Sequence, residues 1–510
     1  MLSYHKKKLC YSVSLRCTYS FLNTISHLHL LSKNTAASII LHITHKKTMS
    51  TIVNILTETF GKESVLNHDQ AATRVASNWR QKQNLDCLAL LRPKTTAELS
   101  QMLAICNQYG QPVVPHGGLT NVVGGVATRA NEIAVSLERM NVIEEINKQN
   151  KTVTVQAGVV LQTLQKTLAD NGELFPLDLG AKGSCMIGGN IASNAGGLQA
   201  LRYGVMRNLV LGLEVVLADG TIISSMNKMM KNNAGYDLKH LFIGSEGTLG
   251  IITKAVLKME DLPESKNTAF IAVESFGKAS RLLQAAKKSL QNSLTSFELL
   301  WQDYYRLMTS PPSPYAAPLP HSYPYYILME ALGQDAEKDK ALFEAFLEEG
   351  LNNGLIVDAC IAQSKQESAW LWAIRENVEL IFSIHKPVFI FDVSLAISDM
   401  EAYIATIKDD LQKVWPGLHF YAFGHMGDGN LHLNISCGED DAVTKRRVEE
   451  IVYAPLQQIG GSITGEHGIG FEKKPWLFLS RTTEEINLMK VIKKALDPKG
   501  ILSPGKLLPG

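Results

Sequence analysis

Short apolar runs alternate with amphipathic stretches over residues 88–125. Residues 88–91 form an apolar run that is followed by Arg92 and ended by Pro93, which predicts a short buried strand. Residues 96–109 carry apolar positions at helical spacing, which predicts a helix capped by Thr95 or Thr96. A second apolar run, residues 113–115, leads directly into the glycine-rich segment 116–125. A strand that enters such a turn exposes consecutive backbone N–H groups, an arrangement that suits phosphate or pyrophosphate.

A second set of strands and helices is predicted between residues 153 and 253. The pattern predicts a strand over 153–158, a helix over 161–168 and a strand over 211–221 that ends in the Asp219-Gly220 turn. Between them, segments 177–180 and 186–197 are rich in small residues, so a large flat ligand can approach the backbone. The chain contains neither a GxGxxG nor a GxxxxGKS/T motif, which excludes a Rossmann fingerprint and a P-loop.

After residue 264 the pattern changes to longer strands that alternate with amphipathic helices. Strands are predicted at 270–274 and 325–330, and helices at 279–289 and 338–350. This arrangement suits an antiparallel sheet backed by helices, with a proline-rich loop at 311–320. Residues 370–376 lie on a further helix that carries Arg375. A guanidinium group can hold a carboxylate through two hydrogen bonds, but an arginine on a helix surface is the alternative.

Residues 423–435 have the pattern of a tight hairpin. Gly427-Asp428-Gly429 provides the positive-φ positions that a turn needs. His425 then ends one arm, and His432 lies three residues past the turn on the other. Strand side chains alternate between faces, so His432 shares one face with two amides, which are Asn430 and Asn434.

The two imidazoles of this hairpin predict a metal site. Zinc and similar borderline metals favour imidazole ligands, and a third ligand is expected from Glu466 or His467 in the glycine-rich segment 461–470. Gly465 and Gly468 flank this pair and can bend the backbone so that both side chains reach one centre. Two ordinary surface histidines in a hairpin are the alternative interpretation.

Composition narrows the class of protein. The chain has 510 residues, of which 45% are hydrophobic and 19% charged, as in a globular enzyme of two or three domains. Its seven cysteines are odd in number and form no CxxC motif, so a disulfide framework is not expected and a reducing compartment is favoured. No run of eighteen apolar residues is present, so no membrane span is predicted.

Charge is distributed unevenly along the chain. Residues 1–48 contain seven Lys or Arg and no acid, which leaves −6 for the rest of a chain whose net charge is +1. The net negative charge of residues 49–510 gives no sign of the basic surface that nucleic-acid binding requires. The basic segment resembles an organelle transit peptide, which would make the protein mitochondrial. If Met49 is instead the true start, a cytoplasmic protein of bacterial type is expected.

The five segments between residues 88 and 260, in this order and spacing, resemble the flavin-binding domain of the vanillyl-alcohol oxidase superfamily. The His-x6-His and Gly-Glu-His-Gly motifs resemble those of its glycolate-oxidase-subunit-like, D-lactate and D-2-hydroxyglutarate dehydrogenase branch. The resemblance implies an α+β fold, with a two-subdomain FAD-binding domain (PCMH type) and an α+β cap domain with an antiparallel sheet. We expect the FAD domain at 49–262, the cap at 263–484, and a C-terminal segment, 485–510, that returns to the FAD domain.

The resemblance also implies site residues. FAD would be held without a covalent bond, because Leu119 follows the first glycine pair where some relatives carry a tethering histidine. Residues 115–121 would hold the pyrophosphate, 177–180 and 188–196 the ring and ribityl chain, and Ile251 and Ile252 the adenine side. Ser503 stands where relatives usually carry Asn, and its hydroxyl can bond the flavin edge. The predicted FAD contacts are Pro115, His116, Gly117, Gly118, Leu119, Thr120, Asn121, Leu177, Asp178, Gly180, Gly188, Gly189, Asn190, Ser193, Asn194, Gly196, Ile251 and Ile252.

The chemistry that the resemblance implies is oxidation of a D-2-hydroxy acid to a 2-oxo acid. A divalent metal, zinc by expectation, on His425, His432 and Glu466 would lower the pKa of the substrate hydroxyl. His467 would take the hydroxyl proton, Arg375, Asn430 and Asn434 would bind the substrate, and the hydride would pass to FAD. Electrons would continue to an electron-transfer flavoprotein, cytochrome or quinone. Whether the protein forms a homodimer is left open.

Two other functions compete with this one. They are an alkylglycerone-phosphate-synthase-like flavin-dependent transferase and a non-catalytic flavoprotein subunit. The hydroxy acid itself is also open. Relatives that act on D-2-hydroxyglutarate commonly carry a lysine two residues before an Asp-x-Ser stretch, and Ile390 stands at that place here. Because Ile390 carries no positive charge, it is in doubt that the substrate has a second carboxylate.

Overall fold

The computed structural model describes residues 51–77 and 82–509. The predicted basic extension, residues 1–48, lies outside the described residues. The chain divides into two units, residues 1–65 and 66–510. In the first unit, residues 51–60 form a helix. The second unit holds the predicted sites.

A parallel sheet supports the first glycine-rich loop. In it, β4 (Ala89–Leu91) and β5 (Val113–His116) both pair with β6 (Ile133–Ser136). The predicted helix is α3 (Thr96–Tyr109), and its cap is Thr95, whose hydroxyl accepts a hydrogen bond from the Glu98 N–H. The fourth strand is β1 (Val65–Asn67), which lies next to β4 in the strand order β1-β4-β6-β5. Between β1 and β4 in the chain come α2 (His68–Ala71) and a separate two-stranded sheet of β2 (Val75–Ser77) and β3 (Lys82–Asn84).

An antiparallel sheet forms the second part of the FAD-binding region, in the strand order β11-β10-β12-β8-β7. The predicted strands at 153–158 and 211–221 correspond to β8 and β10, and the predicted helix at 161–168 to α4. Gly220 of the predicted Asp-Gly turn has φ +91°. The elements of this region are β7 (Ile143–Asn147), β8 (Thr152–Gln156), α4 (Leu161–Ala169), β9 (Glu173–Leu174), α5 (Ile187–Ala192), α6 (Ala200–Tyr203), α7 (Met206–Leu209), β10 (Val210–Val216), β11 (Ile222–Ser225), α8 (Lys239–Phe242), β12 (Ile251–Lys258) and β13 (Glu260–Asp261).

The third sheet has seven antiparallel strands in the order β17-β14-β16-β15-β19-β20-β18. The two strands predicted from sequence are its neighbours β14 and β16. The predicted hairpin of His425 and His432, formed by β19 and β20, belongs to the same sheet, so its position is fixed by strands on both sides. The strands are β14 (Ser265–Val273), β15 (Leu294–Trp301), β16 (Tyr325–Gly333), β17 (Asp358–Ile361), β18 (Phe389–Ser394), β19 (His419–His425) and β20 (Asn430–Ser436).

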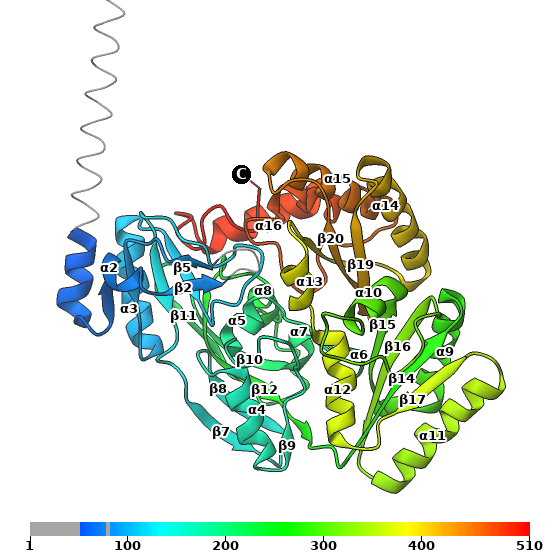
Figure 1. The fold of residues 1–510 in the computed structure, drawn as a ribbon. Helices are drawn as coiled ribbons and strands as arrows, with labels where there is room; N and C mark the ends of the chain where they lie inside the picture. Colours follow the sequence, from blue (N-terminus) through cyan, green and yellow to red (C-terminus); the bar gives the residue numbers. More distant parts are fainter. Residues whose placement is uncertain (1–50, 78–81, 510) are drawn as a thin grey trace, which may run out of the picture. The chain divides into compact units, whose positions relative to one another are not determined.

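Helices cover both faces of this sheet (Figure 1). On β14, Ala269, Ile271 and Val273 pack into a core with α9, α11, α14 and α15. Phe270 and Ala272 point the other way, into a core with α10, α12 and α13. The helices and 3-10 turns are α9 (Phe276–Ser289), η1 (Gln291–Ser293), α10 (Gln302–Met308), α11 (Ala336–Asn352), α12 (Lys365–Glu376), α13 (Glu379–Ile384), η2 (Ile397–Asp399), α14 (Met400–Val414), α15 (Ala442–Gln458), η3 (Lys474–Leu479) and α16 (Thr483–Leu496).

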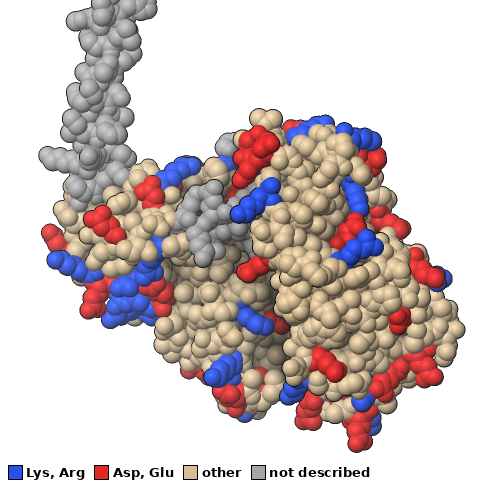
Figure 2. Space-filling view, viewed as in Figure 1, with Lys and Arg blue, Asp and Glu red and all other residues tan. Residues whose placement is uncertain are grey.

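The chain after α16 returns to the parallel sheet. Leu502 forms a parallel bridge with Val113 of β5, and the Ser503 N–H donates to the Val113 carbonyl at 2.8 Å. The predicted α+β class, with an antiparallel sheet in the cap, is confirmed. Among the described residues, no helix is both long and apolar enough to cross a membrane. Figure 2 shows Lys and Arg mixed with Asp and Glu on the face in view, without a patch of one sign.

Candidate active site

A cavity of about 420 Å³ lies against the two predicted glycine-rich segments. We call it the cofactor cavity. Of the eighteen predicted FAD contacts, fifteen line it. These fifteen are Pro115, His116, Gly117, Gly118, Leu119, Thr120, Asn121, Gly180, Gly188, Gly189, Asn190, Ser193, Gly196, Ile251 and Ile252.

The other three predicted contacts lie elsewhere. Leu177 is only 2% exposed and packs into the core. Asn194 sits at φ +50°, and its side-chain oxygen accepts from the Arg207 N–H at 2.9 Å. Asp178 lines a neighbouring cavity and pairs with Lys182. Leu177, Asp178 and Asn194 therefore do not line the cofactor cavity, because a motif range does not show which side chains of a loop turn inward, and their contact with FAD stays a prediction.

Glycine is required where the two cofactor loops meet. A Cβ on Gly118 would lie 2.0 Å from the Ser184 carbonyl oxygen, and one on Gly188 would lie 2.7 Å from the Ala157 Cβ. A Cβ on Gly117 would lie 3.5 Å from the Gly189 Cα, an ordinary van der Waals contact. Bare backbone on both sides of the cavity gives a large flat ligand access to N–H groups. This cradle fits FAD.

Glu246 also lines the cofactor cavity, and sequence reasoning gave it no role. Its carboxylate accepts hydrogen bonds from the Ile469 and Gly470 N–H groups, both at 2.7 Å. Burial raises the pKa of this carboxyl group. Glu246 therefore ties the cofactor cavity to the loop that carries Glu466 and His467. An acid placed between glycines at 244 and 247 was the available signal.

A second cavity, of about 390 Å³, adjoins the cofactor cavity. The two cavities share four lining residues, Leu179, Gly180, Glu466 and His467. Arg375, His425, His432 and Asn434 line the second cavity only. The predicted catalytic groups therefore surround a space directly beside the predicted flavin site.

The predicted hairpin is present, with one correction to its turn. His425 ends β19, Asn430 starts β20, and the two strands pair through Phe423 and His432. Only Gly429 has a positive φ, of +92°, and Gly427 does not. The turn has four residues, and one left-handed position is enough to close it.

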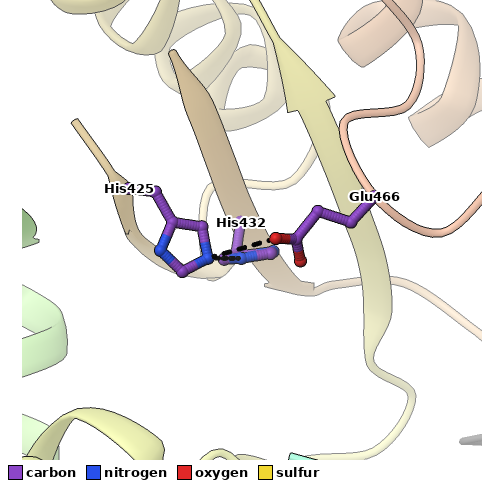
Figure 3. Close-up of side chains that lie close together, drawn as sticks. All are labelled: His425, His432 and Glu466. Carbon is purple, nitrogen blue, oxygen red and sulfur yellow. Dashed lines mark hydrogen bonds and ion pairs between the residues drawn. The ribbon is translucent and has the colours of Figure 1, made fainter. Parts of the chain in front are cut away.

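His425, His432 and Glu466 converge on one point (Figure 3). One ligand atom from each lies within 4.8 Å of the other two. The two Nε2 atoms are 3.3 Å apart, and His425 Nε2 lies 3.6 Å from Glu466 Oε1. Tetrahedral zinc with bonds of about 2.0–2.1 Å separates its ligand atoms by about 3.3–3.4 Å. The donor types and their spacing fit a divalent metal.

Glu298 on β15 is a functional residue that sequence reasoning missed. It is 1% exposed, and its two oxygens bind His425 Nδ1 at 2.6 Å and Arg375 Nε at 2.8 Å. A carboxylate on the outer nitrogen fixes the tautomer of a metal-binding histidine, so His425 Nε2 is left free to bind metal. The sequence signal was a lone acid within the apolar strand 294–301.

The buried charges around Glu298 and the two histidines shift one another's pKa values. Burial opposes charge on Glu298, but His425 and Arg375 outweigh it and hold the pKa of Glu298 at about 2. Burial likewise opposes charge on His425, but Glu298 and Glu466 raise its pKa to about 9. Burial, with His425 and Arg375 nearby, keeps the pKa of His432 well below its usual value.

Asp392 on β18 holds the loop that carries Glu466 and His467. It is fully buried, and its Oδ2 accepts from the Gly465, Glu466 and His467 N–H groups at 2.9–3.1 Å. The Thr464 hydroxyl donates to the same oxygen at 3.0 Å. Three successive N–H groups directed at one carboxylate bend the loop, and both predicted side chains consequently face the second cavity.

The flanking glycines act differently from the prediction. Gly468 does have a positive φ, of +83°, but Gly465 does not. A Cβ on Gly465 would lie 2.1 Å from Asn430 Nδ2 and 2.9 Å from Asp392 Oδ1. Gly465 is therefore required by the close approach of Asn430 and Asp392, and the bend comes from the carboxylate of Asp392.

His467 reaches both cavities from this loop. Its ring centroid lies 6.1 Å from that of His432, and its Nδ1 is 3.7 Å from Asp392 Oδ2. Burial lowers the pKa of His467. A neutral imidazole is the form that accepts a proton.

The three predicted substrate-binding residues separate into two groups. Arg375 is 6% exposed, which excludes a helix-surface arginine, and it lines the second cavity beside Phe423. Asn434 lines that cavity too. Asn430 lines neither cavity, because its Nδ2 donates to Asp392 Oδ1 at 2.7 Å and to the Val393 carbonyl. The Asn430 Oδ1 is buried without a hydrogen-bond partner among the described residues, and Asn430 as a substrate contact stays a prediction.

Comparison with known proteins gives consistent matches over most of the chain. Residues 87–225 match the family model described as "FAD binding domain", and residues 262–507 match "FAD linked oxidases, C-terminal domain". The chain is 40% identical over 451 residues to a probable mitochondrial D-2-hydroxyglutarate dehydrogenase of Oryza sativa subsp. indica, covering 88% of this chain and 80% of the relative. It is 38% identical over 439 residues to a putative mitochondrial D-lactate dehydrogenase of Schizosaccharomyces pombe, covering 84% and 83%.

The fold also has solved neighbours. An alkyldihydroxyacetonephosphate synthase superposes with a TM-score of 0.70 over 89% of this chain and 84% of its own. The two sequences are 17% identical. At that identity the likeness establishes a shared fold and carries no argument for the transferase activity.

Proposed function

This chain belongs to the FAD-linked oxidase family, and we propose on that basis that it oxidises a D-2-hydroxy acid to the 2-oxo acid. The relatives' names support the substrate class. The observation that carries the proposal is the shared wall of the two cavities, where Glu466 and His467 face both. A substrate held there has its C2 carbon beside the flavin site and its hydroxyl beside a base.

Arg375 and Asn434 would hold the substrate. The Nε of Arg375 is bound to Glu298 and its Nη2 lies 3.5 Å from His425 Nε2, which fixes the guanidinium plane and leaves the Nη1 N–H groups for the substrate carboxylate. Asn434 Oδ1 is buried and has no hydrogen-bond partner among the described residues, so it is available to a polar group in the cavity. A buried acceptor without a partner is costly unless a ligand supplies one.

His425, His432 and Glu466 would hold a divalent metal, zinc by expectation. A metal bound there would supply Lewis acidity that lowers the pKa of the substrate hydroxyl. His467 would accept the hydroxyl proton, and Asp392 would keep the His467 backbone in place. FAD bound in the cofactor cavity would supply the acceptor for the C2 hydride. FAD itself would be held without a covalent bond in the cofactor cavity.

The remaining features of the proposal concern the whole protein. The FAD domain would span residues 49–262, the cap 263–484 and the returning segment 485–510. Reduced FAD would be reoxidised by an electron-transfer flavoprotein, a cytochrome or a quinone, with a homodimer as the assembly to test. The relatives are named as mitochondrial, which supports a mitochondrial location. Fusion of residues 1–48 to a fluorescent protein tests that location directly.

A substrate panel tests the activity. Purified protein loaded with FAD is mixed with matched D- and L-2-hydroxy acids and an artificial electron-accepting dye. We expect dye reduction with D-acids and little with the L-enantiomers. A transferase would give no net dye reduction with any hydroxy acid. A structural metal would make chelation unfold the protein, rather than only stop turnover.

A further inference from the structure

Building on the proposed function, we infer that the second cavity takes a D-2-hydroxy acid whose side chain is apolar and carries no second carboxylate. The cavity lining includes the predicted metal ligands with His467, Arg375 and Asn434, which we take as the reactive end. The other lining side chains would then face the substrate side chain, with Phe423 nearest the reactive end, beside Arg375 and His432. They are Asp178, Leu179, Lys182, Leu198, Glu376, Val378, Phe382, Ile390 and Phe423.

The charges in that outer part do not suit a second carboxylate. Its one lysine, Lys182, already binds Asp178 Oδ1 through its Nζ at 2.7 Å. Glu376 lines the same part of the cavity, so two acids stand against one lysine. Arg375 is the other long cation of the lining, but its Nε is bound to Glu298, its Nη2 lies 3.5 Å from His425 Nε2, and its remaining N–H groups would serve the first carboxylate. A distal carboxylate would meet more negative than positive charge.

The rest of the outer lining is apolar. Six of its nine side chains are aliphatic or aromatic, and Ile390 is among them. Ile390 pairs across the sheet with Asn434, so its side chain stands next to the residue proposed to bind the substrate. Burying one methylene is worth about four-fold in binding at 25 °C. A straight apolar chain should therefore gain about four-fold in kcat/KM with each added carbon until the cavity is filled.

One pair of substrates isolates the distal group. D-2-hydroxyvalerate and D-2-hydroxyglutarate share a five-carbon skeleton and differ at C5, where the first has a methyl group and the second a carboxylate. With the FAD-loaded wild-type protein we expect kcat/KM to rise from D-lactate through D-2-hydroxybutyrate to D-2-hydroxyvalerate. We expect D-2-hydroxyglutarate to fall at least ten-fold below D-2-hydroxyvalerate.

A matched pair of variants tests the cause. Ile390→Lys places a cation in the cavity and should raise the ratio of D-2-hydroxyglutarate to D-2-hydroxyvalerate turnover at least ten-fold. Ile390→Met has a similar length without charge and should leave that ratio within about two-fold of the wild type. FAD content measured on each variant shows whether it is folded, and the wild-type comparison stands if the lysine variant does not fold.

The opposite result has a clear form. If wild-type protein prefers D-2-hydroxyglutarate and Lys182→Gln removes that preference, then Lys182 leaves Asp178 to bind the distal carboxylate and the inference is wrong. In that case the proposed function stands, because a D-2-hydroxy acid is still oxidised. If no hydroxy acid reduces the flavin, the proposed function and the inference fail together.

Discussion

Replacing Asp392 with asparagine should weaken the metal site without any change to a metal ligand. Asp392 is buried, and it accepts hydrogen bonds from the loop that carries Glu466 and His467. Asparagine keeps the shape of the side chain but removes its charge. It also presents an N–H₂ group toward Asn430, whose own Nδ2 currently donates to Asp392 Oδ1.

The size of the effect follows from the number of donors. Three N–H groups and one hydroxyl converge on Asp392 Oδ2, and the buried Lys473 Nζ lies 3.6 Å from the same atom. A hydrogen bond to a charged group is worth about 1.5–3 kcal/mol, against about 0.5–1.5 kcal/mol for a neutral one. Losing about 1 kcal/mol at each of the four donors gives roughly 4 kcal/mol, before the cost at Lys473. Because the loop supplies a ligand, we expect about 10–100-fold weaker metal binding, the usual effect of an outer-shell substitution.

The assay is equilibrium dialysis against buffered zinc, with metal and FAD measured on the same sample. Asp497→Asn is the matched control. Asp497 is 1% exposed and also anchors a loop, accepting from the Ile501 and Leu502 N–H groups, but it lies in the C-terminal segment away from the metal site. It should lower stability and leave metal affinity unchanged. Equal metal affinity in Asp392→Asn and the wild type would refute the role assigned to Asp392.

Four further predictions follow from the same contacts. Arg375→Lys should weaken apparent substrate binding by about 1.5–3 kcal/mol with FAD content unchanged, and an unaltered KM for every acid tried would remove Arg375 from the site. Glu466→Gln should lose metal and be partly rescued by excess metal, whereas His467→Ala should keep metal and FAD but reduce flavin about 10²–10⁴-fold more slowly; equal metal loss in both would make His467 a ligand. Acid or heat should release FAD into the supernatant, and flavin left on the precipitated chain would contradict non-covalent binding. Burial lowers the pKa of His116 to about 3, so the stability that its neutral form contributes is present above about pH 6.5 and is lost as pH falls toward 3. His116→Gln should therefore reduce the slope of the unfolding free energy against pH in that window, by up to about 1.4 kcal/mol per pH unit. An unchanged slope would show that His116 is protonated in the folded state.

Local patterns in the sequence predicted much of this fold. The helix at 96–109 was found with its cap, because capping and helical spacing are short-range signals. The hairpin of His425 and His432 was found for the same reason. Local patterns could not supply strand order, so the placement of that hairpin inside a seven-stranded sheet appeared only in the structure.

The supporting residues of the site were not predictable in the same way. Glu298 is 127 residues from His425 in sequence, and Asp392 is 74 residues from Glu466. Neither belongs to a motif that contains the group it supports. Buried acids in apolar strands signal that a partner exists, since burying a lone charge is costly, but they do not say which residue it is.

Asn430 does not line the second cavity, for a related reason. Strand alternation correctly put it on the same face as His432 and Asn434. That face is not all cavity, because the Gly465 backbone packs so closely on the Asn430 amide that a Cβ on Gly465 would lie 2.1 Å from Asn430 Nδ2. Coverage of a sheet by a distant loop is a tertiary feature, which period-two spacing cannot reveal.

The most direct test of the central claim is anaerobic mixing of the FAD-loaded protein with a D-2-hydroxy acid, followed through the visible absorbance of the flavin. Without oxygen or a dye, the only acceptor for the substrate hydride is the bound FAD. We predict that D-2-hydroxyvalerate bleaches the oxidised flavin band in a single turnover, with one 2-oxo acid formed per flavin, while its L-enantiomer leaves the band intact. A flavin that stays oxidised with D-2-hydroxyvalerate, D-lactate and D-2-hydroxyglutarate alike would contradict the assignment of this chain as a D-2-hydroxy-acid dehydrogenase.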